Sequence, residues 1–200
     1  HSNEFLMDNG TIGLWFNTTN IALNQGLWSK DSSGFDTGGH LTIYLESSTL
    51  NVRLQSTSTH NFLSTTNISS NTWHHAVTTF GGEGMKLYLD GVLVDNNSYT
   101  GGTGTTSGGI GNYEPLAIGA STKVSGDGVV TPIESPFSGV IDEVTVFNRS
   151  LSAQEILDQY HNGLLELNFA VRSCDDSNCD TETWTDIADT SPQTLSVSDN

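Results

Sequence analysis

The chain has 200 residues, enough for one domain with a real hydrophobic core, and its 23 acidic residues outnumber the six lysines and arginines. Its formal net charge of −17 argues against binding to nucleic acid or to an anionic membrane surface, and it favours cations or neutral polar ligands. There is no apolar run of the roughly 20 residues that a membrane span needs, and the N-terminus lacks the pattern of a signal peptide. We therefore expect a soluble segment cut from a longer precursor, without membrane insertion.

Alternation of apolar and polar residues predicts strands along most of the first 150 residues. In the first of them, Ile12, Leu14 and Phe16 share one face. The predicted strands cover residues 11–17, 40–46, 50–55, 73–80, the two halves of 85–95, 115–120 and 139–147. The second and third are joined by a short polar link and are expected to form an antiparallel hairpin. The dipeptide Asp90-Gly91 predicts a tight turn between the two halves of 85–95.

One helix is predicted, at about residues 153–161. Ser152 and Glu155 have the spacing of a capping box at its start. Leu151 and Ile156 have the spacing of a hydrophobic staple. The chain is otherwise β-rich, so the helix stands alone.

Many short strands and one helix predict an all-β fold, a two-sheet antiparallel sandwich. Residues 1–163 are expected to form this domain. Residues 164–200 are too few for an independent core, so they either extend the domain or begin the next one. The glycine-rich and serine-rich segments 101–114 and 121–136 are predicted to be long surface loops, either for binding or as tolerated insertions.

Three stretches in a fixed order resemble the laminin G-like family of the concanavalin A-like lectin/glucanase jelly rolls, in its bacterial and archaeal surface-protein branch. They are TIGLWFN at 11–17, NTWHHAVTTFGGEGMKLYLDGVLV at 71–94, and FSGVIDEVTVFNRSLSAQEILDQYHNG at 137–163. The resemblance covers about residues 4–163. It implies two curved sheets in jelly-roll order, core positions for Trp15 and Trp73, and often a bound Ca²⁺ with recognition of glycans or proteins. It does not choose among binders, structural modules and hydrolases, because the fold serves all three.

The strand 139–147 contains two adjacent carboxylates. Strict alternation places Asp142 on a face with valines, and a carboxylate against apolar surface needs neutralisation, coordination or several hydrogen bonds. Because basic residues are scarce, we expect an oxygen-preferring cation, Ca²⁺, at Asp142, with Asp31 or Asp36 as further ligands. The alternatives are an Asp142 satisfied by backbone amides or lying at a strand edge. Glu143 is expected to face solvent.

Aromatic and polar residues opposite the core leucines predict a sugar-binding platform. Tyr44, Arg53 and Tyr88 are expected to lie on it if their strands are neighbours, and Trp28 and Tyr113 on its rim. The alternative is an ordinary polar outer face.

No Glu-X-Asp-X-Glu strand, the pattern that places two carboxylates of a glycan hydrolase on one face, occurs in the sequence, so we expect no enzyme activity. Asp142 and Glu143 are neighbours on a strand and point to opposite faces. His74 and His75 diverge for the same reason, and His75 is expected to be packed or hydrogen-bonded rather than to bind a metal.

Two features favour a secreted or cell-surface protein. Cys174 and Cys179 have the spacing of a small disulfide loop. Predicted N-glycosylation sites are Asn17, Asn67, Asn96 and Asn148.

The expected function is that of a non-catalytic, calcium-stabilised carbohydrate-binding module of a larger extracellular protein, with a polysaccharide or other glycan as its partner. The alternative is a structural or adhesive module of a cell-surface protein that contacts a surface protein and has no sugar site. In both cases, neighbouring domains of the same polypeptide are expected.

Overall fold

The structure is a computed structural model that describes residues 3–31, 37–109, 114–122, 133–164, 169–171 and 185–187. The chain forms two compact units, residues 1–161 and 162–200. In the second unit, β11 (Phe169–Val171) pairs antiparallel with β12 (Thr185–Ile187). None of the helices in the described ranges is long and apolar enough to cross a membrane.

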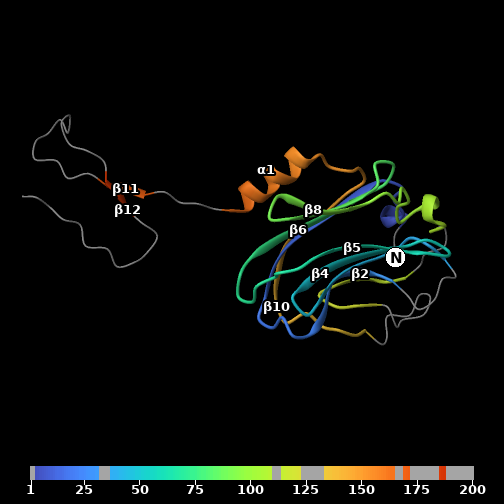
Figure 1. Cartoon of the computed structure of the whole chain (residues 1–200), viewed down its shortest axis with the longest axis horizontal. Coiled ribbons are helices and arrows are strands. Elements are labelled where there is room, and N and C mark those ends of the chain that lie inside the picture. Colours follow the sequence, from blue (N-terminus) through green and yellow to red (C-terminus); the bar gives the residue numbers. More distant parts are fainter. Residues whose placement is uncertain are drawn as a thin grey trace, which may run out of the picture. The chain divides into compact units, whose positions relative to one another are not determined.

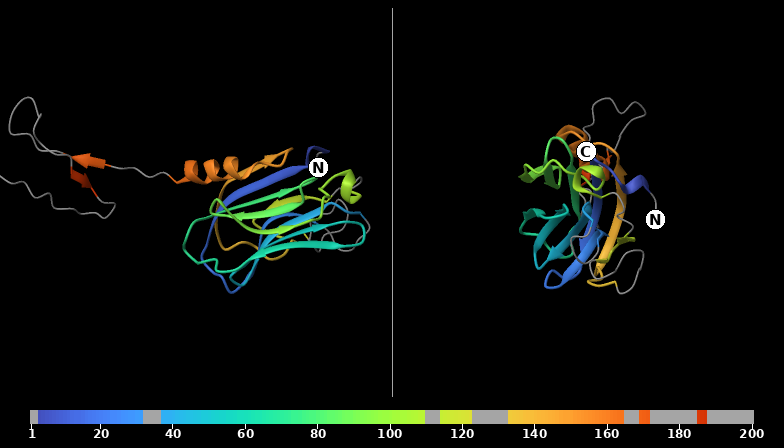
Figure 2. Two further views of the ribbon diagram at one scale, coloured as in Figure 1. Left: turned by 45° about the horizontal axis from the view of Figure 1, so that its top comes forward. Right: turned by 90° about the vertical axis from the view of Figure 1, so that its right-hand side faces the viewer.

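The first unit is a sandwich of two five-stranded antiparallel sheets (Figures 1 and 2). The first sheet has the order β10 (Gly139–Phe147), β1 (Gly10–Thr18), β6 (His74–Phe80), β7 (Met85–Leu89), β8 (Val92–Asn97). The second has the order β5 (His60–Thr65), β4 (Thr49–Gln55), β3 (His40–Glu46), β2 (Asn24–Lys30), β9 (Leu116–Ile118). The predicted all-β jelly-roll sandwich is therefore confirmed.

The hydrophobic core lies between the two sheets. Ile12, Leu14 and Phe16 project into it from β1, as their alternation predicts, and every one is fully buried. From the second sheet the facing side chains are Leu41, Ile43, Leu45, Leu50, Val52, Leu54 and Leu63. Because these residues alternate along their strands, their neighbours point to the opposite face of the second sheet, away from the core.

The predicted hairpin and the meander of residues 73–95 are confirmed by the pairing of β3 with β4 and by the order β6-β7-β8. Two strands, β2 and β5, were not predicted. In β2 the alternation is broken by a β-bulge between Gly26 and Trp28. β5 is an edge strand with four polar residues in six, so only Leu63 faces the core. The bulge hides the period of two in β2, and Leu63 alone marks the core face of β5.

Helix α1 (Ala153–Gly163) packs on the outer face of the first sheet (Figure 1). The capping box is confirmed: the backbone N–H of Glu155 donates to the Ser152 hydroxyl at 3.3 Å, and the Ser152 N–H donates to the Glu155 carboxylate at 2.8 Å. The staple residues Leu151 and Ile156 lie together in a small apolar cluster with Val77. The sequence therefore predicted both the position and the start of this helix.

The N-terminal segment is tied to the glycine-rich segment after β8. The short 3-10 helices η1 (Asn3–Phe5) and η2 (Thr105–Ser107) lie at this junction. Asp8 accepts hydrogen bonds from Thr105 and Thr106, and the hydrogen bond from the Thr105 hydroxyl is the main reason why the pKa of Asp8 is lowered. Residues 101–104 are buried, so this part of the predicted surface loop is packed against the sandwich.

Candidate functional site

A pocket of about 360 Å³ opens on the face of the second sheet that points away from the core. Strand pairing brings its residues together: Thr42, Arg53 and Phe62 are direct neighbours across β3, β4 and β5. Gly26 on β2 lies opposite Tyr44 on β3. Further lining residues are Asn24, Asp31, Glu46, His60, Ser121 and Glu134.

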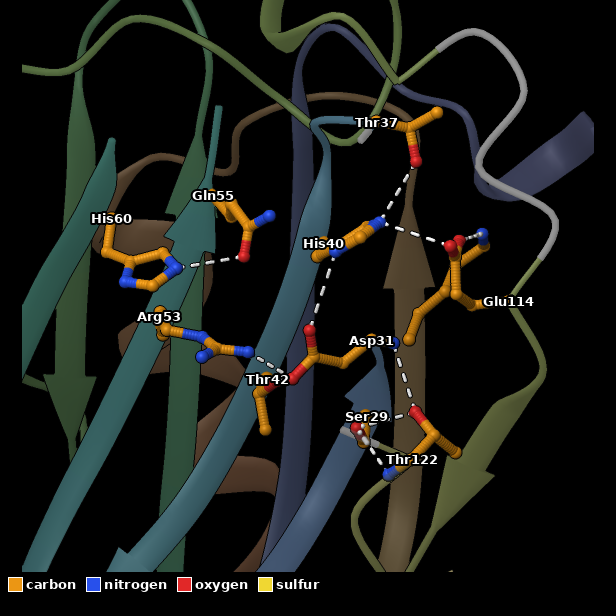
Figure 3. Close-up of polar contacts among 11 residues, drawn as sticks. Ser29, Asp31, Thr37, His40, Thr42, Arg53, Gln55, His60, Glu114 and Thr122 are labelled. Atoms are coloured by element: carbon orange, nitrogen blue, oxygen red, sulfur yellow. Dashed lines mark hydrogen bonds and ion pairs between the residues drawn. The ribbon is translucent and has the colours of Figure 1, made fainter. Parts of the chain in front are cut away.

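The floor of the pocket is a buried ion pair (Figure 3). Asp31, directly after β2, accepts hydrogen bonds on one carboxylate oxygen from the Arg53 guanidinium and, at 3.1 Å, from the Thr42 hydroxyl. Asp31 is 0% exposed and Arg53 is 8% exposed. The pair joins β2 to β4 across the intervening β3, so it holds three strands of the floor in one arrangement.

The charged network extends from Asp31 to His40, Glu114 and Lys30. The second oxygen of Asp31 lies 3.6 Å from Nδ1 of His40, and Nε2 of His40 lies 3.2 Å from Glu114 (Figure 3). Nζ of Lys30 lies 4.0 Å from the other oxygen of Glu114. Burial lowers the pKa of Lys30 to about 8, and the negative charge of Glu114 opposes that shift. Arg53 and Lys30 thus lie near the carboxylates of Asp31 and Glu114 in a region shielded from water, and these opposite charges compensate one another.

One wall of the pocket comes from chain segments that close over the end of β2. Hydroxyl groups join Ser29 to Thr122 at 2.9 Å, and the Asp31 N–H donates to the Thr122 hydroxyl at 3.0 Å. A Cβ on Gly26 would lie 2.3 Å from the Ala120 carbonyl carbon, so the backbones approach closely only because residue 26 is glycine. This wall is therefore fixed by the local sequence of β2.

The rim of the pocket is aromatic and amphipathic. Phe62 is 49% exposed, and its ring packs edge-to-face with His60 at 5.9 Å. His60 is oriented by its Nε2 contact with the Gln55 amide oxygen at 3.0 Å (Figure 3). Burial raises the pKa of Tyr44, and the charge of Glu46 adds to this, so its hydroxyl is a neutral donor and acceptor at physiological pH. The pocket thus combines a flat apolar surface with groups that hydrogen-bond hydroxyls.

The structure brings together only part of the predicted platform. Tyr44 and Arg53 both line the pocket, as expected. The prediction for Tyr88 is wrong, because β7 belongs to the first sheet and Tyr88 is buried at 4% exposure in the apolar cluster near α1. The prediction for Trp28 is also wrong: it is 2% exposed in the core, edge-to-face with Phe5. Tyr113 lies outside the described residues.

The other aromatic and histidine predictions are confirmed for Trp15 and His75 but wrong for Trp73. Trp15 is buried, stacked on His75 at 5.0 Å and on Tyr160 of α1 at 5.6 Å. Trp73 is 44% exposed, so its expected core position is wrong. His75 is packed as predicted, and His74 diverges from it to contact Asp90, with Nδ1 to carboxylate at 2.9 Å.

Asp142 does not lie against the apolar face from which a cation was predicted. β10 contains a β-bulge opposite β1, with Glu143 in the left-handed region at a φ of 47°. The bulge resets the alternation, so Ile141 and Val144 both face the core, and Asp142 and Glu143 are both exposed. Asp142 therefore needs no partner to offset burial.

Of the other predicted calcium ligands, the structure describes only Asp31. Asp31 lies at the second sheet, paired with Arg53, whereas Asp142 lies on the first. Asp36 lies outside the described residues. In the described parts of the chain, no group of three or more His, Cys, Asp or Glu residues is placed to hold a metal ion. Ca²⁺ binding as such stays a prediction.

Cys174 and Cys179 lie outside the described residues. Of the predicted glycosylation sites, Asn67, Asn96 and Asn148 are exposed, and Asn17 is half-buried on β1. Their use stays a prediction.

The sequence reasoning missed Phe62 and His60, because β5 was not recognised as a strand. It also missed Glu46 and Glu134. A usable signal was present in the spacing of His60 and Phe62, which alternate with the core residue Leu63. Glu134 reaches the pocket by a backbone bridge with Ser121, with N–O distances of 2.8 and 3.0 Å, which no local pattern reveals.

Comparisons with known proteins agree with this architecture. A search of curated protein sequences finds no significant match. Among solved structures, the CBM40 of the Ruminococcus gnavus IT-sialidase bound to α2,3-sialyllactose has a TM-score of 0.63 at 16% identity, covering 79% of this chain and 85% of that chain. A leech intramolecular trans-sialidase complexed with 2,7-anhydro-Neu5Ac has a TM-score of 0.64 at 17% identity, covering 83% of this chain and 25% of that chain.

A SAP-like pentraxin from Limulus polyphemus has a TM-score of 0.52 at 18% identity, covering 76% of this chain and 69% of that chain. At such identities the similarity shows the fold alone. The sequence profile of a laminin G family, described as the concanavalin A-like lectin/glucanases superfamily, matches residues 1–157. The chain therefore belongs to this laminin G family of the concanavalin A-like lectin/glucanases superfamily.

Proposed function

We propose that the first unit is a non-catalytic carbohydrate-binding module that holds a glycan in the pocket over β2, β3, β4 and β5. The observation that carries the proposal is the half-exposed ring of Phe62, placed beside Arg53 and within the same pocket as Tyr44. A sugar ring presents C–H groups to an aromatic face and hydroxyls to polar side chains, and this pocket offers both.

The similar solved structures support the choice of ligand class, because the CBM40 holds α2,3-sialyllactose and the leech trans-sialidase holds 2,7-anhydro-Neu5Ac. The proposal extends to an extracellular location in a larger polypeptide, which fits the exposed predicted glycosylation sites. Calcium stabilisation remains a separate proposal that rests on the family resemblance. The absence from the sequence of a Glu-X-Asp-X-Glu pattern supports a binding role over hydrolysis.

The test is a glycan array followed by calorimetry on the whole 200-residue chain. Phe62→Ala should weaken binding of the selected glycan about fivefold, since stacking of an aromatic ring contributes about 1 kcal/mol. Tyr44→Phe should weaken it severalfold by removing one hydrogen bond. The matched control is Val92→Ala, which trims an exposed apolar side chain on β8 outside the pocket and should leave affinity unchanged.

Absence of binding to every glycan on the array, or a Phe62→Ala variant that binds as tightly as Val92→Ala, contradicts the proposal. Release of shorter sugars from any polysaccharide by the purified chain contradicts its non-catalytic part.

A protein-binding role is the second candidate. Val92, Leu93 and Val94 are 62%, 46% and 38% exposed on β8, which is an edge strand. Exposed apolar residues on an unpaired edge favour contact with another chain. If this surface carries the function, Val92→Asp abolishes binding to a surface partner while the pocket variants do not.

A further inference from the structure

We infer that the pocket selects neutral glycans over anionic ones, although similar folds are found in sialidase chains. This inference rests on the proposed function and specifies its substrate class. It follows from the charges that line the pocket and from which of them are already paired.

The positive charge in the pocket is already compensated by a buried carboxylate. Arg53 is the only arginine or lysine among the described lining residues. Its guanidinium is hydrogen-bonded to the fully buried Asp31, which also accepts the Thr42 hydroxyl. An anionic ligand that drew Arg53 away from Asp31 would leave a buried carboxylate without its counter-charge.

The negative charges in the pocket are, by contrast, accessible. Glu46 at the end of β3 is exposed and Glu134 is half-buried, and both line the pocket. Neither forms an ion pair with any residue in the described part of the chain. At neutral pH these carboxylates repel a carboxylate or sulfate on a ligand, whereas they accept strong, charge-assisted hydrogen bonds from hydroxyl groups. The net charge of −17 adds a field of the same sign.

The ligand class with the matching chemistry is a neutral, hydroxyl-rich sugar. Its ring would lie against Phe62, and its hydroxyls would donate to Glu46 and Glu134 and exchange hydrogen bonds with Tyr44. A sialoside shares the sugar chemistry but adds a carboxylate. In this pocket that carboxylate would be repelled by Glu46 and Glu134, and the one arginine, Arg53, is already paired with Asp31.

The experiment measures affinity for matched glycan pairs at about pH 7.5, where carboxylates are ionised. Each pair consists of a neutral oligosaccharide and the same oligosaccharide carrying sialic acid or sulfate, such as lactose and 3′-sialyllactose. The inference predicts at least about tenfold tighter binding of the neutral member, a difference of about 1.4 kcal/mol. Raising the salt from about 0.05 M to about 0.5 M should narrow the ratio, because screening weakens the repulsion.

The double variant Glu46→Gln/Glu134→Gln should reduce the neutral-to-anionic ratio about fivefold or more. Glu83→Gln is the matched control, since Glu83 is exposed in the turn between β6 and β7 and does not line the pocket. It should leave the ratio unchanged.

Tighter binding of the sialylated or sulfated member overturns the inference while leaving the proposed function intact. Equal binding of both members, or a double variant that behaves like Glu83→Gln, also overturns the inference alone. Failure of every glycan to bind overturns the proposed function and the inference together.

Discussion

Asp31, at the end of β2, and Arg53, on β4, form a buried ion pair that spans the intervening strand β3 and makes the floor of the pocket. Two charges removed from water compensate each other only while both are present. The pair is therefore a structural requirement of the pocket, and it also occupies the only guanidinium that the described lining offers.

Removing one member should destabilise the domain strongly. Asp31→Asn leaves the Arg53 charge buried without its partner, and we expect the free energy of unfolding to fall by about 3–5 kcal/mol. Unfolding in urea measures the change. The matched control is Asp142→Asn, an exposed aspartate whose replacement should cost less than about 0.5 kcal/mol.

A double-mutant cycle separates the pair from its surroundings. Asp31→Asn combined with Arg53→Met should be less destabilised than the sum of the two single variants by about 2 kcal/mol, because neither charge is left unpaired. Additive effects, or an Asp31→Asn variant as stable as Asp142→Asn, would show that the ion pair does not hold the floor.

Local pattern predicted which side chains share a face but not which strands are neighbours. Tyr44, Arg53 and Tyr88 each alternate correctly with core residues, so all three were placed on outward faces. Tyr44 and Arg53 meet because β3 and β4 are a hairpin, a contact that is local in sequence. Tyr88 lies in the other sheet. The jelly-roll strand order is set by long-range packing, which the alternation of residues does not encode.

The same limit explains the error at Asp142. Strict alternation holds only where both strands of a pair keep register, and a single extra residue reverses the faces beyond it. Glu143 is that residue, and nothing in the neighbouring sequence distinguishes a bulge from a regular strand. The capping box of α1 was predictable because its two residues lie three positions apart and contact each other directly.

Acid sensitivity should be concentrated at His75. Burial against Trp15 lowers the pKa of His75 from 6.5 to about 4, against a smaller opposing effect of Asp90. Between these two pH values the unfolded chain binds a proton at this residue and the native state does not. The free energy of unfolding should therefore fall as the pH drops from about 6.5 to about 4, by an amount on the order of 3 kcal/mol.

His75→Phe keeps a ring for stacking on Trp15 and removes the titrating group. It also removes Nδ1, a buried atom with no hydrogen-bond partner among the described residues. Urea unfolding at several pH values should show that this variant loses less stability than the wild type across the window. His161→Gln, at an exposed position of α1, is the control and should keep the wild-type slope. Identical slopes for His75→Phe and wild type would rule out His75 as the source.

The predicted calcium site has a thermal test. A cation that binds only the native state raises the free energy of unfolding by about 2.7 kcal/mol at 100 times its Kd. Calcium at Asp142 therefore requires a melting temperature that rises with Ca²⁺, returns with a chelator, and no longer responds in Asp142→Ala. Asp158→Ala removes an exposed carboxylate of α1 and should keep the response. A melting temperature that changes with neither Ca²⁺ nor chelator would exclude this site.

Because of the bulge in β10, we expect glycine substitutions at two exposed positions of this strand to have different effects on the free energy of unfolding. Glu143 has a φ of 47°, a region that costs an ordinary residue roughly 1–2 kcal/mol and costs glycine little. Val140, 56% exposed, has no such backbone requirement. Glu143→Gly should therefore leave the free energy of unfolding unchanged or raise it by up to about 1 kcal/mol, because relief of strain offsets the added freedom of the unfolded chain.

Val140→Gly, the matched control, should lower the free energy of unfolding by roughly 0.5–1 kcal/mol, since it adds the same freedom without relieving strain. Glu143→Val should lower it by about 1–2 kcal/mol, because a β-branched side chain fits the left-handed region poorly. Urea unfolding of the three variants ranks them directly. Equal destabilisation by glycine at both positions would mean that Glu143 is not strained, and that the bulge does not fix the exposure of the two acidic side chains.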